Sequence, residues 1–259
     1  MGTTRRNSRV IRLGNVAIGG TYPVSIQSMT NTDTRDVEST VGQILQLHLL
    51  GCELIRLAVP DIEAAQALEA IRAESPIPII ADIHFDHRLA LAAMQYGADG
   101  IRLNPGNLDG EAQVREVAEE AVRRGIPIRV GANSGSIRPA RIKKFREQGM
   151  SHEEAIAEAL VESALEQCAM LEKFGVTALK AALKSSSVPV TVEAYRKFAE
   201  RTDYPLHIGV TEAGTPGRGI VKSAVGIGTL LLEGIGDTLR VSRSEERRVG
   251  KECRSRWSP

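Results

Sequence analysis

The sequence predicts an α/β protein, a parallel (β/α)₈ TIM-type barrel, and three observations lead to this prediction. The chain has 259 residues, and one such barrel needs about 250. Short apolar runs alternate with amphipathic stretches, which is typical of parallel strands joined by helices. Aromatic residues make up 3% of the chain, so we expect a core of aliphatic residues, as in strands buried on both faces. An open doubly wound sheet is the alternative.

Eight short apolar runs are predicted to be the barrel strands, because they are too short and too β-branched for helices. Three of them follow a turn that places a proline at the start of the strand, Pro78, Pro127 or Pro205, where a missing N–H group is tolerated. The predicted strands are Pro23–Ser28, Leu54–Val59, Ile77–Asp82, Gly100–Leu103, Ile128–Ala132, Ala178–Leu183, Leu206–Val210 and Thr238–Val241.

Helix signals fill the intervals between these strands. Ser151 and Glu154 form a capping box before a long helix that ends at Gly175. Asp61 and Asp86 are predicted N-caps of two further helices. The other predicted helices are Asp36–Leu50, Ile62–Ala73, a helix ending at Tyr96, and Val190–Glu200.

One connection is unusually long. Residues Ser134 to Met150 follow the fifth strand, are rich in Gly, Arg, Lys and Ser, and show little apolar periodicity. A long structureless loop on this face of a barrel is either an ordinary surface excursion or a lid over a ligand. The sequence does not decide between the two.

Charge and composition exclude several classes of protein. The formal net charge is +1, but Arg243–Pro259 contains six Lys or Arg and three Asp or Glu, so residues 1–242 carry −2. A nucleic-acid-binding face would need a basic surface, so no nucleic acid partner is expected. No apolar run approaches the roughly 20 residues that span a bilayer, so no membrane association is expected. Three cysteines that are far apart in sequence favour a reducing compartment, and we expect a cytoplasmic protein.

Polar side chains gather at the predicted carboxyl ends of the strands, where the active sites of these barrels lie. Five of them are cations inside apolar segments, where an unpaired charge is costly to bury. Guanidinium groups bind phosphate in a bidentate way and lysine adds a point charge. Five cations suit a diphosphate better than a single carboxylate. The five cations are Arg56, Arg102, Arg129, Lys184 and Arg240.

Other polar positions accompany these cations, and the glycine-rich segments Thr215–Gly219 and Gly234–Gly236 are expected to add backbone donors after strands seven and eight. Single members of the set have simpler explanations. Asp82 and His84 could be a hydrogen-bonding pair, and Glu212 could be the ion-pair partner of Lys184 or Arg240. His48, His87, His152 and His207 are assigned no role, and Cys52 and Cys168 are expected to pack in the core. The other strand-end candidates are Gln27, Ser28, Asn31, Asn104, Asn107, Asn133, Thr211 and Ser242.

With these residues, the sequence resembles the 4-hydroxy-3-methylbut-2-enyl diphosphate synthase family, iron–sulfur enzymes of isoprenoid biosynthesis. The matching segments occur in order, and their combination is more specific than any one of them. They are Val24–Thr32, Ile55–Pro60, Ala81–Asp86, Ile101–Asn107, Ile128–Asn133, Leu206–Gly214, Val221–Ala224 and Glu233–Ser242.

The resemblance implies a function and a set of site residues. The family reductively opens 2-C-methyl-D-erythritol 2,4-cyclodiphosphate, with electrons from ferredoxin or flavodoxin delivered by a [4Fe–4S] cluster in a C-terminal domain, and forms homodimers. By resemblance, Glu212 is the catalytic acid, and Asp82, His84 and Asn104 line the site. The residues implied to hold the diphosphate are Arg56, Arg102, Arg129, Asn133, Lys184, Arg240 and Ser242.

The chain departs from the family pattern at two places. Ser187 stands where the family has an acidic residue after strand six, and serine also caps helices well. Beyond Ser242 the sequence no longer follows the family. We therefore expect a barrel over 1–242 and a disordered or artefactual tail over 243–259. One cysteine in that tail, Cys253, cannot supply the several thiolates of a cluster. The expected function is the substrate-binding barrel of the synthase, inactive alone; the alternatives are a pterin-binding transferase-type barrel and a fragment without function.

Overall fold

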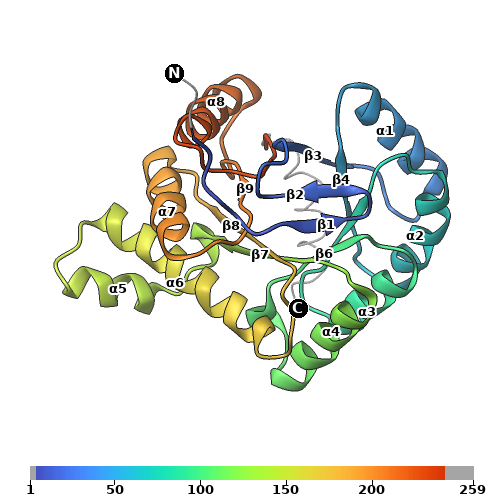
Figure 1. Cartoon of the computed structure of the whole chain (residues 1–259), viewed down its shortest axis with the longest axis horizontal. Helices are drawn as coiled ribbons and strands as arrows, with labels where there is room; N and C mark the ends of the chain where they lie inside the picture. Colours follow the sequence, from blue (N-terminus) through green and yellow to red (C-terminus); the bar gives the residue numbers. More distant parts are fainter. Residues whose placement is uncertain (1–3, 243–259) are drawn as a thin grey trace.

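The computed structural model describes residues 4–242, and these form a parallel eight-stranded barrel surrounded by helices (Figure 1). The hydrogen-bonded strand order is β8-β7-β6-β5-β4-β3-β10-β9, and a parallel bridge between Ala181 and Leu206 joins β8 to the start of β9 and closes the ring. The strands are β3 (Ser25–Met29), β4 (Leu54–Ala58), β5 (Ile79–Asp82), β6 (Gly100–Arg102), β7 (Ile128–Asn133), β8 (Leu179–Lys184), β9 (His207–Ile208) and β10 (Thr238–Leu239). Both the predicted fold class and the eight predicted strands are confirmed.

The three prolines predicted at strand starts occupy equivalent positions in the barrel. The carbonyl groups of Pro78, Pro127 and Pro205 each accept a hydrogen bond from the neighbouring strand, from the N–H groups of Ile55, Ile101 and Ala181 at 3.0 Å in every case. A proline has no N–H to donate but keeps its carbonyl, so it suits the first residue of a strand, where only the carbonyl is needed for pairing.

Helices cover the outside of the barrel, and their caps agree with the sequence signals. The carboxylates of Asp36, Asp61 and Asp86 accept hydrogen bonds from backbone N–H groups in the first turns, and Ser151 with Glu154 forms the expected capping box. The helices are α1 (Val37–Leu49), α2 (Ile62–Glu74), α3 (His87–Gln95), α4 (Glu111–Arg124), α5 (Pro139–Glu147), α6 (His152–Glu172), α7 (Val188–Arg201) and α8 (Pro216–Leu232). None of these helices is both long and apolar enough to cross a membrane.

An N-terminal hairpin that the sequence analysis did not predict closes the amino-terminal end of the barrel. Its strands are β1 (Ile11–Leu13) and β2 (Val16–Ile18), which pair antiparallel. The buried side chains of the hairpin pack against Leu54 and Ile80, which point down the barrel axis from β4 and β5. In Figure 1 the hairpin lies across the centre of the barrel. Any ligand site must therefore lie at the opposite end.

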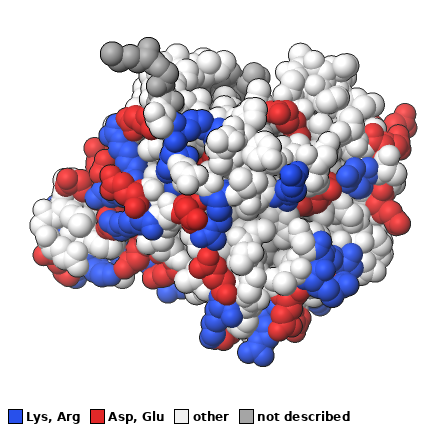
Figure 2. Space-filling model, in the orientation of Figure 1, with Lys and Arg blue, Asp and Glu red and all other residues white. Residues whose placement is uncertain are grey.

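The face that carries the hairpin has charges of both signs (Figure 2). Several of these charges form ion pairs, among them Arg5 with Asp237, Arg9 with Asp203 and Arg196 with Glu233. The surface there is mixed in charge, unlike the interior of the barrel described below.

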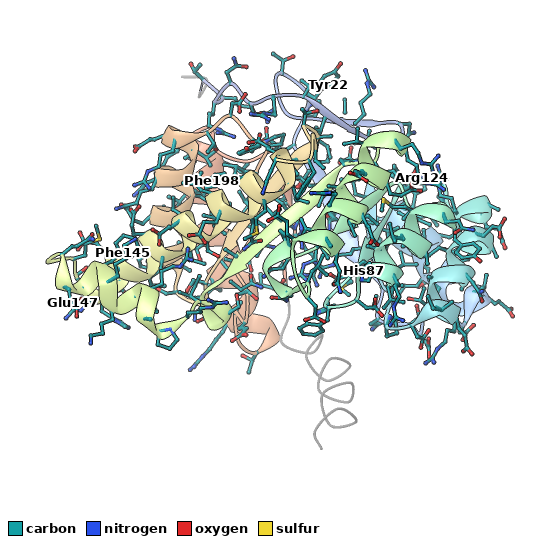
Figure 3. The ribbon with its side chains drawn as sticks, turned by 90° about the horizontal axis from the view of Figure 1, so that it is seen from below. Tyr22, His87, Arg124, Phe145, Glu147 and Phe198 are labelled. Atoms are coloured by element: carbon teal, nitrogen blue, oxygen red, sulfur yellow. The ribbon has the colours of Figure 1, made fainter. Side chains whose placement is uncertain are left out.

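The segment between Ser134 and Met150 is not structureless, which corrects the expectation of a long loop there. The segment holds a short 3₁₀ turn, η2 (Ser134–Ser136), and the helix α5. Phe145 of α5 is buried against Ala155 and Ala159 of α6, and Lys144 donates to Glu162 at 2.6 Å. Figure 3 shows Phe145 and Glu147 at the outer edge of the molecule. The weak apolar periodicity reflects a helix that buries only one large side chain, Phe145, against α6.

Candidate active site

A polar cavity of about 150 Å³ opens at the carboxyl ends of the strands, the end where barrel enzymes bind their substrates. Five of the residues that line it are cations and one is a carboxylate. The lining residues are Arg56, Asp82, His84, Arg102, Arg129, Gly131, Asn133, Ala182, Lys184, Thr211, Arg240 and Ser242. Nine of the eleven site residues implied by the family resemblance are therefore brought together here, and Thr211 joins them from the other strand-end candidates. The two implied residues that do not line the cavity are Asn104 and Glu212. The other strand-end candidates outside the cavity wall are Gln27, Ser28, Asn31 and Asn107.

The side chains reach the cavity because they occupy alternate positions on their strands. On β7, Arg129, Gly131 and Asn133 share one face, and on β8, Lys180, Ala182 and Lys184 do so. The parallel register pairs these residues across the two strands, Arg129 with Lys180, Gly131 with Ala182 and Asn133 with Lys184. The middle pair has almost no side chain, so the space between the outer pairs stays open.

Asp82 is the carboxylate among the cations and holds two of them in place. Its Oδ1 lies 3.1 Å from the Arg102 guanidinium and its Oδ2 lies 3.4 Å from Nε of Arg56. His84 Nε2 is 3.6 Å from the same Oδ2. Burial by itself would raise the pKa of Asp82, but the charges of Arg56 and Arg102 outweigh it and hold the pKa well below its usual range. Asp82 is therefore ionised at neutral pH and fixes the two arginines.

Arg129 is the most deeply buried arginine of the cavity wall and is not compensated in the same way. It is 6% exposed, and its Nε and Nη1 atoms are buried without a hydrogen-bond partner. Burial lowers the pKa of Arg129 well below its usual value, and the charges of Arg56 and Arg102 lower it further. A buried guanidinium surrounded by like charges is costly, and an anion that accepts from its N–H groups would remove much of that cost.

Asn104 and Glu212 lie outside the cavity wall. The Asn104 side chain accepts a hydrogen bond from the N–H of Gly106 at 3.1 Å and caps the short 3₁₀ helix η1 (Pro105–Asn107). Glu212 is exposed and directly follows Thr211 of the cavity wall. With φ of 52°, Glu212 is the one non-glycine residue with positive φ in the described part of the chain. That backbone conformation is uncommon outside glycine and often marks a functional position.

The two glycine-rich segments have different positions. Thr215–Gly219 forms the start of α8, after β9, so its backbone N–H groups begin a helix of 17 residues at the cavity end of the barrel. The expectation for Gly234–Gly236 was wrong, because this segment precedes β10. An added Cβ on Gly234 would lie 2.4 Å from the carbonyl oxygen of Thr4, so the segment belongs to the amino-terminal end and to N-terminal packing.

Sequence reasoning also missed polar residues on the barrel axis. Lys180 and His207 are 1% and 0% exposed, and His207 Nδ1 lies 2.7 Å from Thr238 Oγ1. His207, to which the sequence analysis assigned no role, is thus a buried polar residue of the barrel. A signal was available for Lys180, since its position two residues before Ala182 and four before Lys184 places it on the inward face. Cys52 and Cys168 are buried, as expected of packing residues.

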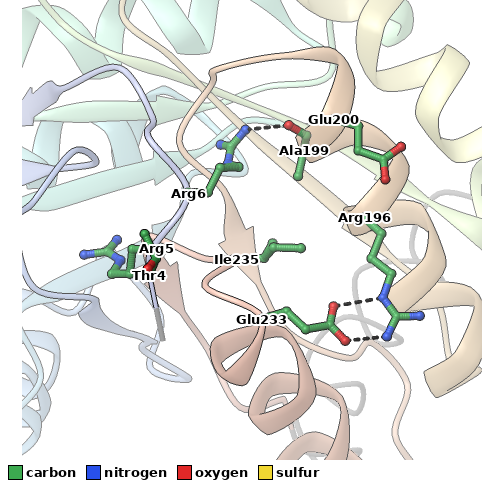
Figure 4. Close-up of a pocket in the computed structure, with 8 residues that line it drawn as sticks. All are labelled: Thr4, Arg5, Arg6, Arg196, Ala199, Glu200, Glu233 and Ile235. Atoms are coloured by element: carbon green, nitrogen blue, oxygen red, sulfur yellow. Dashed lines mark hydrogen bonds and ion pairs between the residues drawn. The ribbon is translucent and has the colours of Figure 1, made fainter. Parts of the chain in front are cut away.

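A larger, open cavity of about 460 Å³ lies at the other end of the barrel and contains none of the predicted site residues. Figure 4 shows how it is built: Arg6 donates to the carbonyl oxygen of Ala199, and Arg196 binds Glu233. Arg6 also donates to Thr202 at 2.6 Å, so it caps the carboxyl end of α7. These contacts tie the N-terminus to the barrel and do not converge on an open centre.

Comparison with known families decides what kind of barrel this is. The GcpE TIM-barrel domain family matches residues 8–254. The chain belongs to this family. The match extends past Ser242, the last residue that the structure describes. The predicted domain boundary at 242 coincides with that residue, and the predicted tail over 243–259 lies outside the described residues.

Curated relatives of this GcpE barrel share about half of its residues. It is 52% identical over 252 residues to a protein of Geobacter sulfurreducens named 4-hydroxy-3-methylbut-2-en-1-yl diphosphate synthase (flavodoxin), covering 96% of this chain and 69% of that protein. A protein of the same name from Lawsonia intracellularis is 52% identical over 242 residues, covering 93% of this chain and 66% of the relative. The chain thus spans about two thirds of the length of these relatives.

Solved structures resemble the barrel in fold alone. Dihydropteroate synthase from Xanthomonas albilineans matches with a TM-score of 0.62 over 97% of this chain and 100% of that one, at 13% identity. Type I 3-dehydroquinate dehydratase from Clostridium difficile matches with a TM-score of 0.64 over 96% of this chain and 99% of that one, also at 13% identity. These similarities support the barrel and say nothing of its substrate.

Proposed function

We propose that this chain is the substrate-binding barrel of a 4-hydroxy-3-methylbut-2-enyl diphosphate synthase and that its cavity takes 2-C-methyl-D-erythritol 2,4-cyclodiphosphate. The name of relatives that are 52% identical over most of the chain supports the substrate. The observation that carries the proposal is the convergence of five cations and one carboxylate on a single cavity. Such an excess of positive charge in a small polar space suits a ligand with more than one phosphate.

In this proposal the cavity wall divides into two groups of residues. Arg129, Lys184 and Arg240, with the amide of Asn133 and the hydroxyl of Ser242, hold the diphosphate. Arg56 and Arg102 contribute to the same anion but are oriented by Asp82. Because these charges are in place before the ligand arrives, little reorganisation accompanies binding or the growth of negative charge as the ring opens.

Glu212 is proposed as the acid that helps a hydroxyl group leave as water, with His84 and Asn104 beside the carbon skeleton. Glu212 and Asn104 lie outside the cavity of about 150 Å³. In this proposal the cavity wall binds the diphosphate, and Glu212 and Asn104 contact the rest of the substrate outside it. The positive φ of Glu212 supports a functional role there.

The reduction itself needs an electron carrier in addition to the barrel. A [4Fe–4S] cluster takes several thiolates, but among residues 4–242 no three His, Cys, Asp or Glu residues are placed to hold a metal. The described residues therefore do not fit the cluster. We infer that a cluster domain, flavodoxin or ferredoxin, and a homodimer take part in the complete reaction, and that the barrel works in the cytoplasm, which its free cysteines Cys52 and Cys168 support.

The binding half of the proposal is tested by titrating the 259-residue chain with the cyclic diphosphate in a calorimeter at pH 7. We expect saturable binding, weakened roughly tenfold or more by Arg129→Met, because a hydrogen bond to a charged group contributes about 1.5–3 kcal/mol. The matched control is Arg123→Met on the exposed face of α4, which should bind normally. Tight binding of a dihydropterin with no response to the cyclic diphosphate would instead favour the transferase-type barrel. Failure of the chain to unfold cooperatively would favour a fragment without function.

A further inference from the structure

Beneath the cavity, the interior of the barrel continues as a layer of buried polar side chains. Gln27 from β3, Lys180 from β8 and His207 from β9 are each at most 3% exposed. Buried atoms of all three have no hydrogen-bond partner, namely both amide atoms of Gln27, Nζ of Lys180 and Nε2 of His207. A barrel core is normally filled by branched apolar side chains, so a layer of unpartnered polar groups indicates a function.

Within this layer, Lys180 is linked to the cavity by its register, because it pairs with Arg129 of β7, which lines the cavity wall. It also stands two residues below Ala182, so its side chain points into the barrel directly under the open space between Gly131 and Ala182. Lys180 itself does not line the cavity. An anion in the cavity would therefore act on Lys180 through its charge, across the Arg129 side chain.

The charges around Lys180 are mostly positive. Arg129 on β7 acts on the charge of Lys180, and Lys180 in turn acts on His207 of β9. Lys184 on β8 and Arg56 on β4 are further cations that act on His207. Asp237, just before β10, is the carboxylate that favours the charged form of Lys180. Burial lowers the pKa of Lys180 to about 7, and the charge of Arg129 contributes to the shift. In the free barrel, Lys180 is therefore largely neutral above neutral pH.

We propose that Lys180 becomes protonated when the diphosphate binds above it. Its neutral amine takes up one proton from solvent, and the resulting ammonium group strengthens binding of the anion. This inference rests on the proposed function, since it needs a multiply charged anion in the cavity. The energetic reason is that each negative charge brought into a buried site favours protonation of a nearby amine. Lys180 acts on the ligand through its field and through Arg129, as a positioning residue.

The cyclic diphosphate is itself a suitable probe, because it does not titrate in the relevant range. Each phosphorus of a cyclic diphosphate ester carries one strongly acidic oxygen, and the second ionisation near neutral pH belongs to phosphate monoesters. Any proton taken up on binding near pH 8 therefore comes to the protein. Calorimetry in two buffers of different ionisation enthalpy measures this uptake directly.

The wild-type chain is expected to take up a large part of one proton per ligand bound at pH 8 and much less at pH 6, because the pKa of Lys180 in the free barrel is lowered to about 7. The affinity should fall roughly tenfold or more between pH 7 and pH 9. Binding without proton uptake at pH 8 would overturn this inference alone. Absence of binding at every pH would overturn the proposed function together with it.

Variants assign the proton to Lys180. Lys180→Met keeps the length of the side chain without its charge, and we expect it to abolish the uptake and to flatten the affinity between pH 7 and pH 9. The control Lys173→Met, an exposed lysine on the outer surface next to α6, should behave as wild type. Uptake that persists in Lys180→Met would show that another group titrates. If Lys180→Met does not fold, Lys180→Gln replaces it, and the wild-type uptake still tests the inference.

Discussion

Gly131 on β7 lies beside Ala182 on β8 in the parallel register, and both line the cavity between Arg129 below and Lys184 above. A Cβ added at Gly131 would meet no atom within 4 Å. The cavity therefore exists because two small residues meet where the neighbouring pairs carry long cations. The open space between Gly131 and Ala182 results from their small side chains and not from an unusual backbone conformation.

Gly131→Val is expected to fill the cavity and to weaken binding of the cyclic diphosphate by tenfold or more, while the barrel still folds. The reason is steric, since the new methyl groups enter open space that the ligand needs. Calorimetric titration and thermal unfolding measure the two effects. The control is Gly42→Val on the exposed side of α1, where an added Cβ also meets nothing. Normal binding by the Gly131 variant would show that the ligand lies elsewhere.

Asp82→Asn is expected to lower the free energy of unfolding by roughly 3 kcal/mol at pH 7, because removing one partner of a buried ion pair leaves the other charges uncompensated. The folded-state pKa of Asp82 is depressed, so its ionised form stabilises the fold above the unfolded pKa of about 3.9. The difference between wild type and variant should thus be constant above about pH 5 and should shrink as the pH falls through the folded pKa.

Urea unfolding at several pH values measures this difference. Asp109→Asn, an exposed residue before α4, is the control and should change little. A difference between wild type and Asp82→Asn that grows on acidification would contradict the expected role of Asp82.

The sequence was sufficient for those parts of the structure that depend on local pattern. Strands such as Leu54–Ala58 and caps such as Asp61 carry their signals within a few residues. The N-terminal hairpin was missed because each of its strands has three residues and gains its stability from Leu54 and Ile80, which lie far along the chain. The helix α5 was missed because a single residue, Phe145, provides most of its burial.

The site was predictable to the extent that cations stood out in apolar strands. Alternation along a strand places Arg129 and Lys184 on the inward face, and a barrel brings such faces together. Lys180 and His207 did not stand out, because a polar residue near the start of a strand resembles a solvent-exposed turn residue in sequence. Only closure of the ring, through Ala181 and Leu206, buries them.

The β8–β9 closure gives a third prediction, which concerns Tyr195. Its fully buried hydroxyl accepts a hydrogen bond from the N–H of Leu183 at 3.1 Å and donates one to the carbonyl of His207 at 2.6 Å. Tyr195→Phe leaves both backbone groups without this partner, so a loss of about 1–3 kcal/mol in the free energy of unfolding is expected. Urea denaturation measures it. Tyr22→Phe, at an exposed tyrosine, serves as the control, and equal stability of the two variants would refute the prediction.

The last prediction tests whether α5 is part of the binding site. Phe145 is 7% exposed and packs with Ala155 and Ala159 in a cluster separate from the main core. Phe145→Ala should remove roughly 3 kcal/mol of packing. Because the cluster is separate, the loss should appear as faster amide hydrogen exchange confined to α5 and the first turns of α6, with binding of the cyclic diphosphate unchanged. Exposed Val122→Ala on α4 is the control for exchange. Weaker binding in Phe145→Ala at normal barrel stability would instead mean that α5 closes over the ligand as a lid.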